Sequence, residues 1–240
     1  MLAAAVLVAP GAAAAEEFHG SATLYGWLPW IDADVTTGQG GVSASLSGGD
    51  VVDALDFTIM ATADVQYGRF GAILDFIYGK FSDDATSPDF FGSNLKMSLK
   101  QTLVTGALTY RVIDRDGAFL DAMAGARFVD MSTDVTILGG GAAGLVQQSS
   151  GGATWVDPII GLRGNLPLTK RLSVNALADI GGFGVGSDLS WEVFTGLDYA
   201  FSDRLSGRMG FRYISIDYSD NGRKFDVEFY GPALGVMVNF

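Results

Sequence analysis

The sequence contains no cysteine, and this absence excludes several kinds of structure. Without cysteine there is no disulfide framework, no thiolate metal site and no lipid-modified cysteine anchor. Basic residues are also scarce, since 15 Lys and Arg stand against 27 Asp and Glu, for a formal net charge of −12. Nucleic-acid binding needs a basic face. We therefore expect no nucleic-acid partner.

Long hydrophobic runs are missing as well. After Ala15 no stretch approaches the roughly 18 consecutive apolar residues of a membrane-spanning helix. Nevertheless, 48% of the residues are hydrophobic, and 33 glycines are present. The hydrophobic residues must therefore be dispersed, at every second position, as they are in the strands of a transmembrane β-barrel.

The first 15 residues differ from the rest of the chain. They are apolar and end in alanines before Glu16 and Glu17. A short apolar segment followed by small residues is typical of a secretory signal peptide. A short hydrophobic helix at the start of the fold is the less favoured alternative. We expect a signal peptide over residues 1–15 and a single barrel domain over residues 16–240.

Apolar and polar residues alternate through most of the remaining chain. From Phe57 to Tyr67 the odd positions are apolar or aromatic, and the even positions are mostly polar. A period of two predicts a strand with one apolar and one polar face. Ten such segments span residues 19–33, 54–68, 70–81, 94–111, 117–132, 152–165, 171–182, 188–200, 204–217 and 224–240. Each is longer than the 9–11 residues that a tilted strand needs to cross a bilayer.

The connections between these segments alternate in length. Short connections are expected at 68–69, 114–117, 166–170 and 202–203, and mostly longer loops at 34–53, 82–93, 133–151, 183–187 and 218–223. Outer-membrane barrels combine short periplasmic turns with longer outer loops. The sequence therefore predicts an all-β fold, a closed antiparallel transmembrane β-barrel of about ten strands, with 8 or 12 as alternatives. Both termini would be periplasmic.

Aromatic residues on the apolar faces fall into two bands. Tyr67, Phe70, Tyr110, Tyr199 and Phe240 lie near the short connections, and Trp30, Tyr78, Phe128, Trp191, Tyr213 and Tyr230 lie toward the long loops. Membrane interfaces favour this arrangement, whereas a soluble β-sandwich, the alternative fold, has no reason to adopt it. A final Phe240 on such a strand resembles the signal read by the barrel-assembly machinery, which we expect as a partner during biogenesis.

Two features fit this pattern poorly. In segment 94–111 the apolar residues move from odd positions such as Leu99 to even positions such as Val104. Either a β-bulge near Gln101 shifts the phase, or the half with Lys96 and Lys100 projects above the membrane. In addition, Pro29, Pro158 and Pro232 lie inside predicted strands, where each removes a hydrogen-bond donor.

The polar faces would place a set of charged side chains in the lumen. These are Asp64, Asp75, Asp121, Arg127, Asp157, Arg163, Asp179, Glu192, Asp198, Arg208 and Arg212. Buried charges are tolerated when they are paired. The set is either a plug of ion pairs or the selectivity element of a narrow channel. We favour the plug, because small barrels are usually filled by their own side chains.

Enzymatic chemistry has little support. Small barrel enzymes use a histidine as general base, and His19 at the start of the first strand is the only histidine. The glycines of 181–186 lack the Lys-Ser/Thr of a phosphate-binding loop. Asp83, Asp84 and Asp89 do not match a calcium loop and are expected to be solvated. We expect no enzyme activity, no cofactor and no metal.

The pattern also resembles uncharacterised proteobacterial outer-membrane β-barrel proteins, similar to small OmpA/OmpW-like porin-type barrels. The resemblance covers nearly the whole chain after residue 15 and is carried by Trp27-Leu28-Pro29, Asp53 to Phe57 with Met60, Gly68 to Gly71 with Asp75 and Tyr78, Ala124 to Arg127, Trp155 to Pro158 with Gly161-Leu162-Arg163, Gly181 to Asp188 with Trp191, Phe211-Arg212-Tyr213 with Asp217-Tyr218, and Gly231-Pro232. It departs at Trp30, where glycine is expected. The resemblance implies a barrel and an outer-membrane location, and implies no activity. We expect outer-membrane lipid and lipopolysaccharide as partners. It also implies that Pro158 and Pro232 are tolerated in this barrel.

Together these observations predict a structural or surface barrel with a filled lumen. A narrow passive channel for small polar solutes or ions is the alternative. A lipid-modifying enzyme is a remote third.

Overall fold

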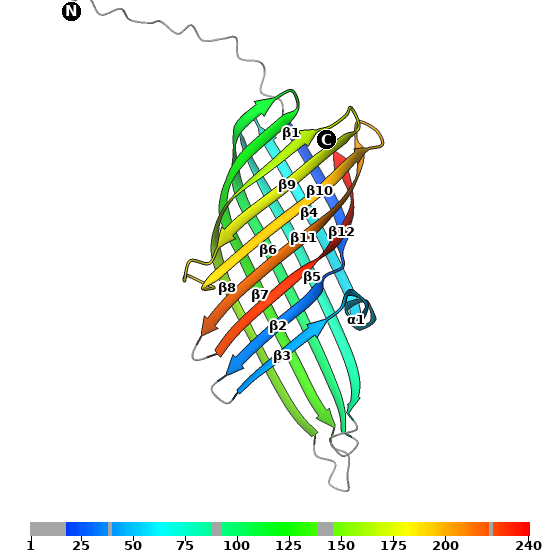
Figure 1. Ribbon diagram of the computed structural model, residues 1–240, viewed down its shortest axis with the longest axis vertical. Coiled ribbons are helices and arrows are strands. Elements are labelled where there is room, and N and C mark those ends of the chain that lie inside the picture. The colour runs from blue at the N-terminus through cyan, green and yellow to red at the C-terminus, as the bar shows by residue number, and fades with distance from the viewer. Residues whose placement is uncertain (1–17, 38–39, 88–92, 139–145, 221–222) are drawn as a thin grey trace, which may run out of the picture.

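The computed structural model describes residues 18–37, 40–87, 93–138, 146–220 and 223–240 (Figure 1). The expected signal peptide, 1–15, lies outside these residues. The strands are β1 (Phe18–Trp27), β2 (Trp30–Thr37), β3 (Gly40–Leu46), β4 (Leu55–Tyr67), β5 (Phe70–Ser87), β6 (Ser93–Arg115), β7 (Ala118–Leu138), β8 (Val146–Pro167), β9 (Leu172–Gly181), β10 (Leu189–Ala200), β11 (Leu205–Asp220) and β12 (Arg223–Asn239). The one helix among the described residues, α1 (Gly48–Ala54), is seven residues long. No helix in the described part of the chain is therefore long and apolar enough to cross a membrane.

The strands form a closed antiparallel barrel. From β4 to β12 each strand pairs with the next, β1 pairs with β4, and pairing between β1 and β12 closes the ring. That seam runs from Ser21 opposite Asn239 to Trp27 opposite Ala233. β2 continues the direction of β1 along β12, and β3 pairs with β2. The barrel therefore has ten strands with two short additional strands, which confirms the predicted fold class.

Most of the segment predicted as a loop at 34–53 is instead structured. Its described residues contain the end of β2, all of β3 and most of α1. A capping box starts the helix: the Ser47 side chain accepts from the Asp50 backbone, and the Asp50 carboxylate accepts from the Ser47 N–H at 2.8 Å. This reciprocal pairing satisfies two helix N-terminal donors. The prediction was wrong because a short hairpin and a seven-residue helix give too little periodicity to detect.

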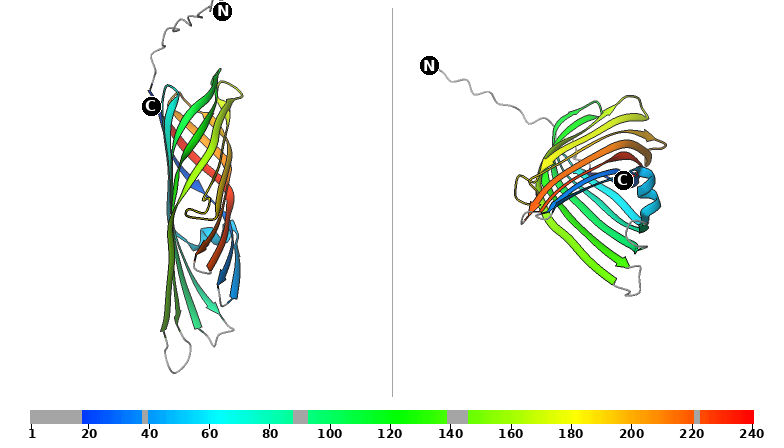
Figure 2. Two further views of the ribbon diagram at one scale, coloured as in Figure 1. Left: turned by 90° about the vertical axis from the view of Figure 1, so that its left-hand side faces the viewer. Right: turned by 60° about the horizontal axis from the view of Figure 1, so that its bottom comes forward.

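The wall of the barrel is uneven in height. β5 to β8 have 18, 23, 21 and 22 residues, whereas β9 and β10 have 10 and 12. We call β5 to β8 the tall wall; Figures 1 and 2 show it extending beyond the neighbouring strands at the long-loop end. Most of the predicted loops 82–93 and 133–151 therefore belong to strands, as the pairing of Thr86 with Asn94 shows. These stretches are polar and lack a clear alternation, so the sequence pattern indicated loops.

The β-bulge near Gln101, one of the two alternatives for segment 94–111, is absent. β6 pairs with β5 in one continuous register from Tyr110 to Ser93, and its register with β7 shifts only between Arg111 and Ile113. Gln101 and Leu103 are both buried inside the barrel. The apparent phase slip arises because the interior itself becomes apolar along this strand.

The three prolines lie where a ladder is interrupted. The Pro158 carbonyl accepts from Gly182 at 3.1 Å, just past the last β8–β9 pair, Ile159 opposite Gly181. Its nitrogen faces the same side, where pairing has ended and no donor is needed. The Pro232 carbonyl accepts from Leu28 at 3.0 Å at the break between β1 and β2, and Pro29 lies in that break.

Candidate functional site

The interior of the barrel gathers the charged side chains. All eleven ionisable residues that the sequence assigned to the lumen lie on the inner wall or at its rim, and Asp121, Arg127 and Asp157 are completely buried. Most of them are divided between two layers at different depths. The layer nearer the long loops consists of Asp75, Arg127, Asp179, Glu192 and Arg212, which we call the central ion layer.

The central ion layer bridges opposite walls. Arg212 of β11 pairs with Asp75 of β5 at 2.6 Å and with Glu192 of β10 at 2.8 Å. Arg127 of β7 pairs with Asp179 of β9 and also with Glu192, each at 2.8 Å. Glu192 is thus shared by both arginines. Because β5 and β11 are separated by several strands on either path around the ring, these contacts cross the lumen.

Neutral groups add further hydrogen bonds to this layer. The Tyr25 hydroxyl donates to Asp75 at 2.8 Å and accepts from Arg212 at 2.7 Å. Thr62 donates to Asp75 at 2.8 Å. Thr105 accepts from Arg127 Nε at 3.2 Å. Hydrogen bonds of this kind replace the water that buried charges lose.

A second cluster lies at the end with the short turns. Its members are Asp64, Arg111, Asp121, Arg163, Asp198 and Arg208, which we call the short-turn ion layer. Asp121 accepts from Arg111 at 2.9 Å and from Arg163 at 3.1 Å, and Arg163 also pairs with Asp64 across the barrel. Arg208 forms a two-pronged pair with Asp198 at 2.7 and 2.8 Å. Three arginines therefore balance three carboxylates.

Asp157 has a different role from the paired carboxylates. It accepts from the Ser187 backbone at 2.6 Å, from the Ser187 hydroxyl at 2.8 Å and from the Trp155 indole at 3.1 Å. Ser187 is completely buried. Asp157 therefore fastens the connection between β9 and β10 to the inner face of the tall wall.

The interior also contains an apolar layer that the sequence pattern did not predict. It lies beyond the central ion layer, toward the long loops, and consists of Trp27, Met60, Ile77, Leu103, Val129, Ile214 and Phe229, each at most 7% exposed. Val51 of α1 joins this cluster at 3% exposed. The Arg212 guanidinium lies 5.4 Å from the Trp27 ring, so the two layers are in contact.

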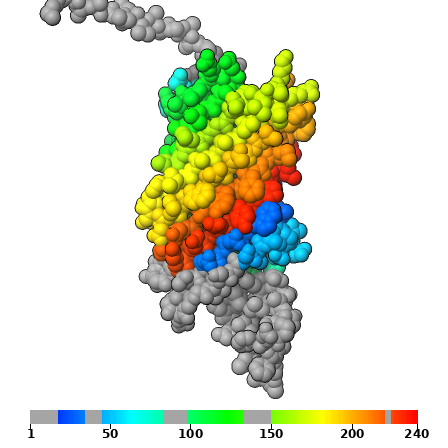
Figure 3. Space-filling model, in the orientation of Figure 1, coloured from blue at the N-terminus to red at the C-terminus, as the bar shows by residue number. Residues whose placement is uncertain are grey.

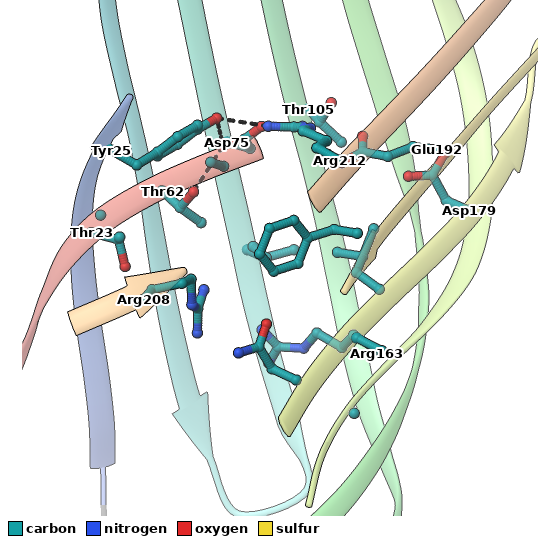
Figure 4. Close-up of a pocket in the computed structure, with 18 of the residues that line it drawn as sticks. Thr23, Tyr25, Thr62, Asp75, Thr105, Arg163, Asp179, Glu192, Arg208 and Arg212 are labelled. Carbon is teal, nitrogen blue, oxygen red and sulfur yellow. Dashed lines mark hydrogen bonds and ion pairs between the residues drawn. The ribbon is translucent and has the colours of Figure 1, made fainter. Parts of the chain in front are cut away.

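Two cavities lie in the part of the lumen between the central ion layer and the short turns. An inner cavity of about 150 Å³, the chamber, lies between the two ion layers. A cavity of about 420 Å³, the vestibule, reaches the short turn with Lys170 and Arg171. Figure 4 shows Tyr25, Asp75 and Arg212 at one side of the chamber, with Arg163 and Arg208 at the opposite side.

Sequence reasoning missed both Arg111 and the apolar layer. A signal for the layer was present, because neighbouring residues such as Phe128 and Val129, or Tyr213 and Ile214, are both apolar. Strands that are apolar on both faces are buried on both faces. Arg111 shares its parity with Thr109 and Gln101, which are buried inside, but the change of phase within segment 94–111 concealed which face of this strand is the inner one.

The aromatic residues assigned to the membrane interfaces lie on the outer surface. Rings stack in a row across four strands, with centroid separations of 4.6 Å for Trp191 and Tyr213, 5.8 Å for Tyr213 and Tyr230, and 6.1 Å for Tyr230 and Trp30. A separate pair is formed by Tyr78 and Phe57, whose ring centroids lie 6.1 Å apart. At the short-turn end, Tyr67, Tyr110 and Tyr199 are 57%, 43% and 45% exposed, and the backbone of Phe240 pairs with Gly20 at the seam.

The remaining candidate residues are dispersed. His19 is exposed at the start of β1. Asp83 and Asp84 continue the backbone of β5, and Asp89 lies outside the described residues. In the described part of the chain no group of three or more His, Cys, Asp or Glu side chains could hold a metal ion.

Comparison with known proteins bears on the fold alone. No protein-family model matches the sequence, and a search of curated proteins also finds no match. Among solved structures, the outer membrane protease OmpT of Escherichia coli aligns over 94% of this chain and 97% of its own, with a TM-score of 0.59 and 11% identity. The translocator domain of the autotransporter NalP of Neisseria meningitidis aligns over 93% and 88%, with a TM-score of 0.46 and 13% identity.

The likeness to OmpT shows that the chain has the fold of a bacterial outer-membrane barrel. It confirms what the sequence resemblance implied about architecture. At this identity it carries no activity from one protein to the other. The narrower resemblance to OmpA/OmpW-like barrels rests on the sequence pattern alone.

Proposed function

We propose that this protein is an outer-membrane barrel whose lumen is sealed, and that its function lies in the tall wall presented at the cell surface. In this proposal it is neither an open channel nor an enzyme. The observation that carries it is the central ion layer, in which Arg212 joins Asp75 to Glu192 across the lumen.

Two successive barriers support a closed lumen. An ion that entered from the short-turn end would meet paired charges held by Arg127, which is completely buried. It would then meet the apolar layer, and apolar constrictions exclude water and ions by dewetting. Viewed from outside, β8 to β12 also form a continuous surface (Figure 3).

The outer surface supports membrane insertion. Leu24, Leu108 and Leu234 are 66%, 73% and 64% exposed on the outer face, which is costly in water and favourable in lipid. The row of stacked rings from Trp191 to Trp30 forms one border of this apolar band. Aromatic girdles of this kind mark the interfaces of membrane barrels. The short turns would then face the periplasm, and the long loops would face the lipopolysaccharide.

The test is the single-channel conductance of the refolded protein in a planar bilayer. We expect no discrete current steps. A positive control is the triple variant Trp27→Ala, Ile214→Ala and Arg212→Ala, which removes parts of both barriers and should conduct. Folding of each sample is checked by the heat-modifiable migration of barrels on gels. Reproducible steps from the wild-type protein would overturn the sealed lumen.

A passive channel is the second candidate, and one observation favours it. The vestibule and the chamber together hollow the lumen from the short turns to the central ion layer, so only part of the length is filled. If wild-type currents appear, Arg127→Ala and Arg212→Ala should change their selectivity. Unchanged selectivity in both variants would remove these arginines from any conduction pathway.

A further inference from the structure

We propose that the chamber and vestibule form a binding site for a compact aromatic carboxylate of about the size of benzoate, which would enter from the short-turn end. The proposal is independent of whether the lumen conducts. It concerns the part of the lumen that side chains leave hollow.

The two cavities adjoin each other. Seven residues line both of them: Thr23, Thr62, Ile73, Phe119, Arg163, Asn175 and Arg208. These residues therefore form the neck between the chamber and the vestibule. The vestibule, unlike the chamber, is also lined by Thr169, Lys170 and Arg171 of the turn after β8. This turn is exposed to solvent and marks the mouth of the vestibule.

The chamber is suited to a small apolar body. Its lining includes the side chains of Ile73, Phe119, Met123, Leu177 and Phe194. The volume is about 150 Å³. Charged groups of the two ion layers lie at its two ends, and a cavity of that volume is large enough for a benzene ring. A longer acyl chain would meet the central ion layer and would not fit.

The neck supplies unused hydrogen-bond donors. Asn175 is only 8% exposed, and its Nδ2 has no hydrogen-bond partner. A buried donor without a partner costs stability, so its presence calls for a ligand or another reason. Arg163 and Arg208 use two guanidinium nitrogens each for their ion pairs. The third nitrogen of each has no protein partner among the described residues.

Charge favours an anion over a cation. Four basic side chains line the vestibule, Arg163, Lys170, Arg171 and Arg208, against two acidic ones, Asp64 and Asp198. Lys170 and Arg171 are exposed at the mouth and form no ion pair with the described part of the chain. An excess of one sign of charge in a cleft raises the local concentration of the opposite ion. The carboxylate would bind the donors at the neck, with its ring in the chamber.

The experiment is a ¹⁹F NMR titration of 4-fluorobenzoate into the refolded full chain in detergent micelles, with empty micelles as the blank. We expect saturable binding, and binding of 4-fluorobenzylamine at least about tenfold weaker. Asn175→Leu should weaken binding about tenfold, because it removes a hydrogen bond to a charged ligand. Leu177→Trp should abolish binding by filling the chamber without altering the donors.

The matched control is Asn165→Leu. Asn165 lies opposite Asn175 on the neighbouring strand and lines only the vestibule, so binding should stay within about twofold of wild type. Equal weakening in the two asparagine variants, or wild-type affinity in Leu177→Trp, would overturn the site. Equal affinity for fluorobenzylamine or for fluorobenzene would overturn the assignment to a carboxylate. If Asn175→Leu does not fold, Leu177→Trp and the ligand series still decide the question.

Discussion

The central ion layer and the apolar layer lie next to each other in the same lumen, yet they connect its walls by different means. The ion layer joins five strands through two arginines that are each shared between carboxylates. The apolar layer joins most of the wall through side chains such as Leu103 and Ile214, which are at most 2% exposed. Ion pairs specify partners, because an unpaired buried charge is costly, whereas apolar contacts contribute stability in proportion to buried area. The comparison suggests that one layer fixes the register of opposite walls and the other supplies cohesion.

The largest effect should come from breaking the ion layer. Arg127→Ala leaves Asp179 and Glu192 without this partner in a buried site, and removal of one member of such a pair costs about 3–5 kcal/mol. The free energy of unfolding can be measured by urea titration of protein in lipid vesicles, followed by tryptophan fluorescence. Arg208→Ala, whose side chain is 27% exposed, is the control and should lose less than half as much. Equal losses would show that burial does not distinguish the two arginines.

A cavity in the apolar layer should have a slightly smaller effect. Leu103→Ala removes a side chain that is 2% exposed, and such truncations cost about 2–5 kcal/mol. Leu108→Ala on the same strand is the matched control, because Leu108 is 73% exposed on the outer surface and leaves no internal cavity. Both variants should keep the lumen silent, since the ion layer remains intact. If Leu108→Ala loses as much free energy of unfolding as Leu103→Ala, packing inside the barrel is not the source of the stability of the apolar layer.

The apolar contacts toward the long-loop end include a stacked ring pair. Trp155 of β8 stacks on Tyr218 of β11 at 4.4 Å, and thereby joins the tall wall to a strand that is not its neighbour. A double-mutant cycle with Trp155→Leu and Tyr218→Leu should give a coupling energy of about 0.5–1.5 kcal/mol. A cycle that pairs Trp155→Leu with the distant Tyr110→Leu should be additive. Zero coupling in the first cycle would mean that this ring contact does not help to hold the tall wall against β11.

The smallest effect lies outside the strands. Hydrogen bonds from the Ser47 side chain and backbone lower the pKa of Asp50 below its usual value of about 3.9. The lowered pKa means that ionised Asp50 stabilises α1 at neutral pH, and this contribution is lost as pH falls through the lowered pKa. Hydrogen exchange of the Val51 amide, which donates to the Ser47 carbonyl, should accelerate relative to its intrinsic rate in that range. In Asp50→Asn the protection should not depend on pH there.

The sequence predicted the architecture well because alternation is a local property. A period of two places Asp64, Arg127 and Arg212 each on the polar face of its own strand, and this requires no information about their ion-pair partners. The ion-pair partners could not be predicted from the sequence, because Arg212 meets Asp75 only after ten strands adopt their registers. The apolar layer was missed for a related reason: where both faces of a strand are apolar, alternation cannot indicate which face is inside. The chamber depends on how side chains fill a closed ring, which no single strand reveals.

The seam between β1 and β12 has a consequence for how the protein folds. It pairs Ser21 with Asn239, so the contact that closes the ring joins residues near opposite ends of the described chain. Contacts of such large sequence separation form late and slowly, because the loop entropy must be lost before they contribute. Every intermediate before closure carries two unpaired strand edges, and such edges promote aggregation. The protein therefore has to be protected from aggregation until its last strand is available, and closure of the ring then pairs both edges.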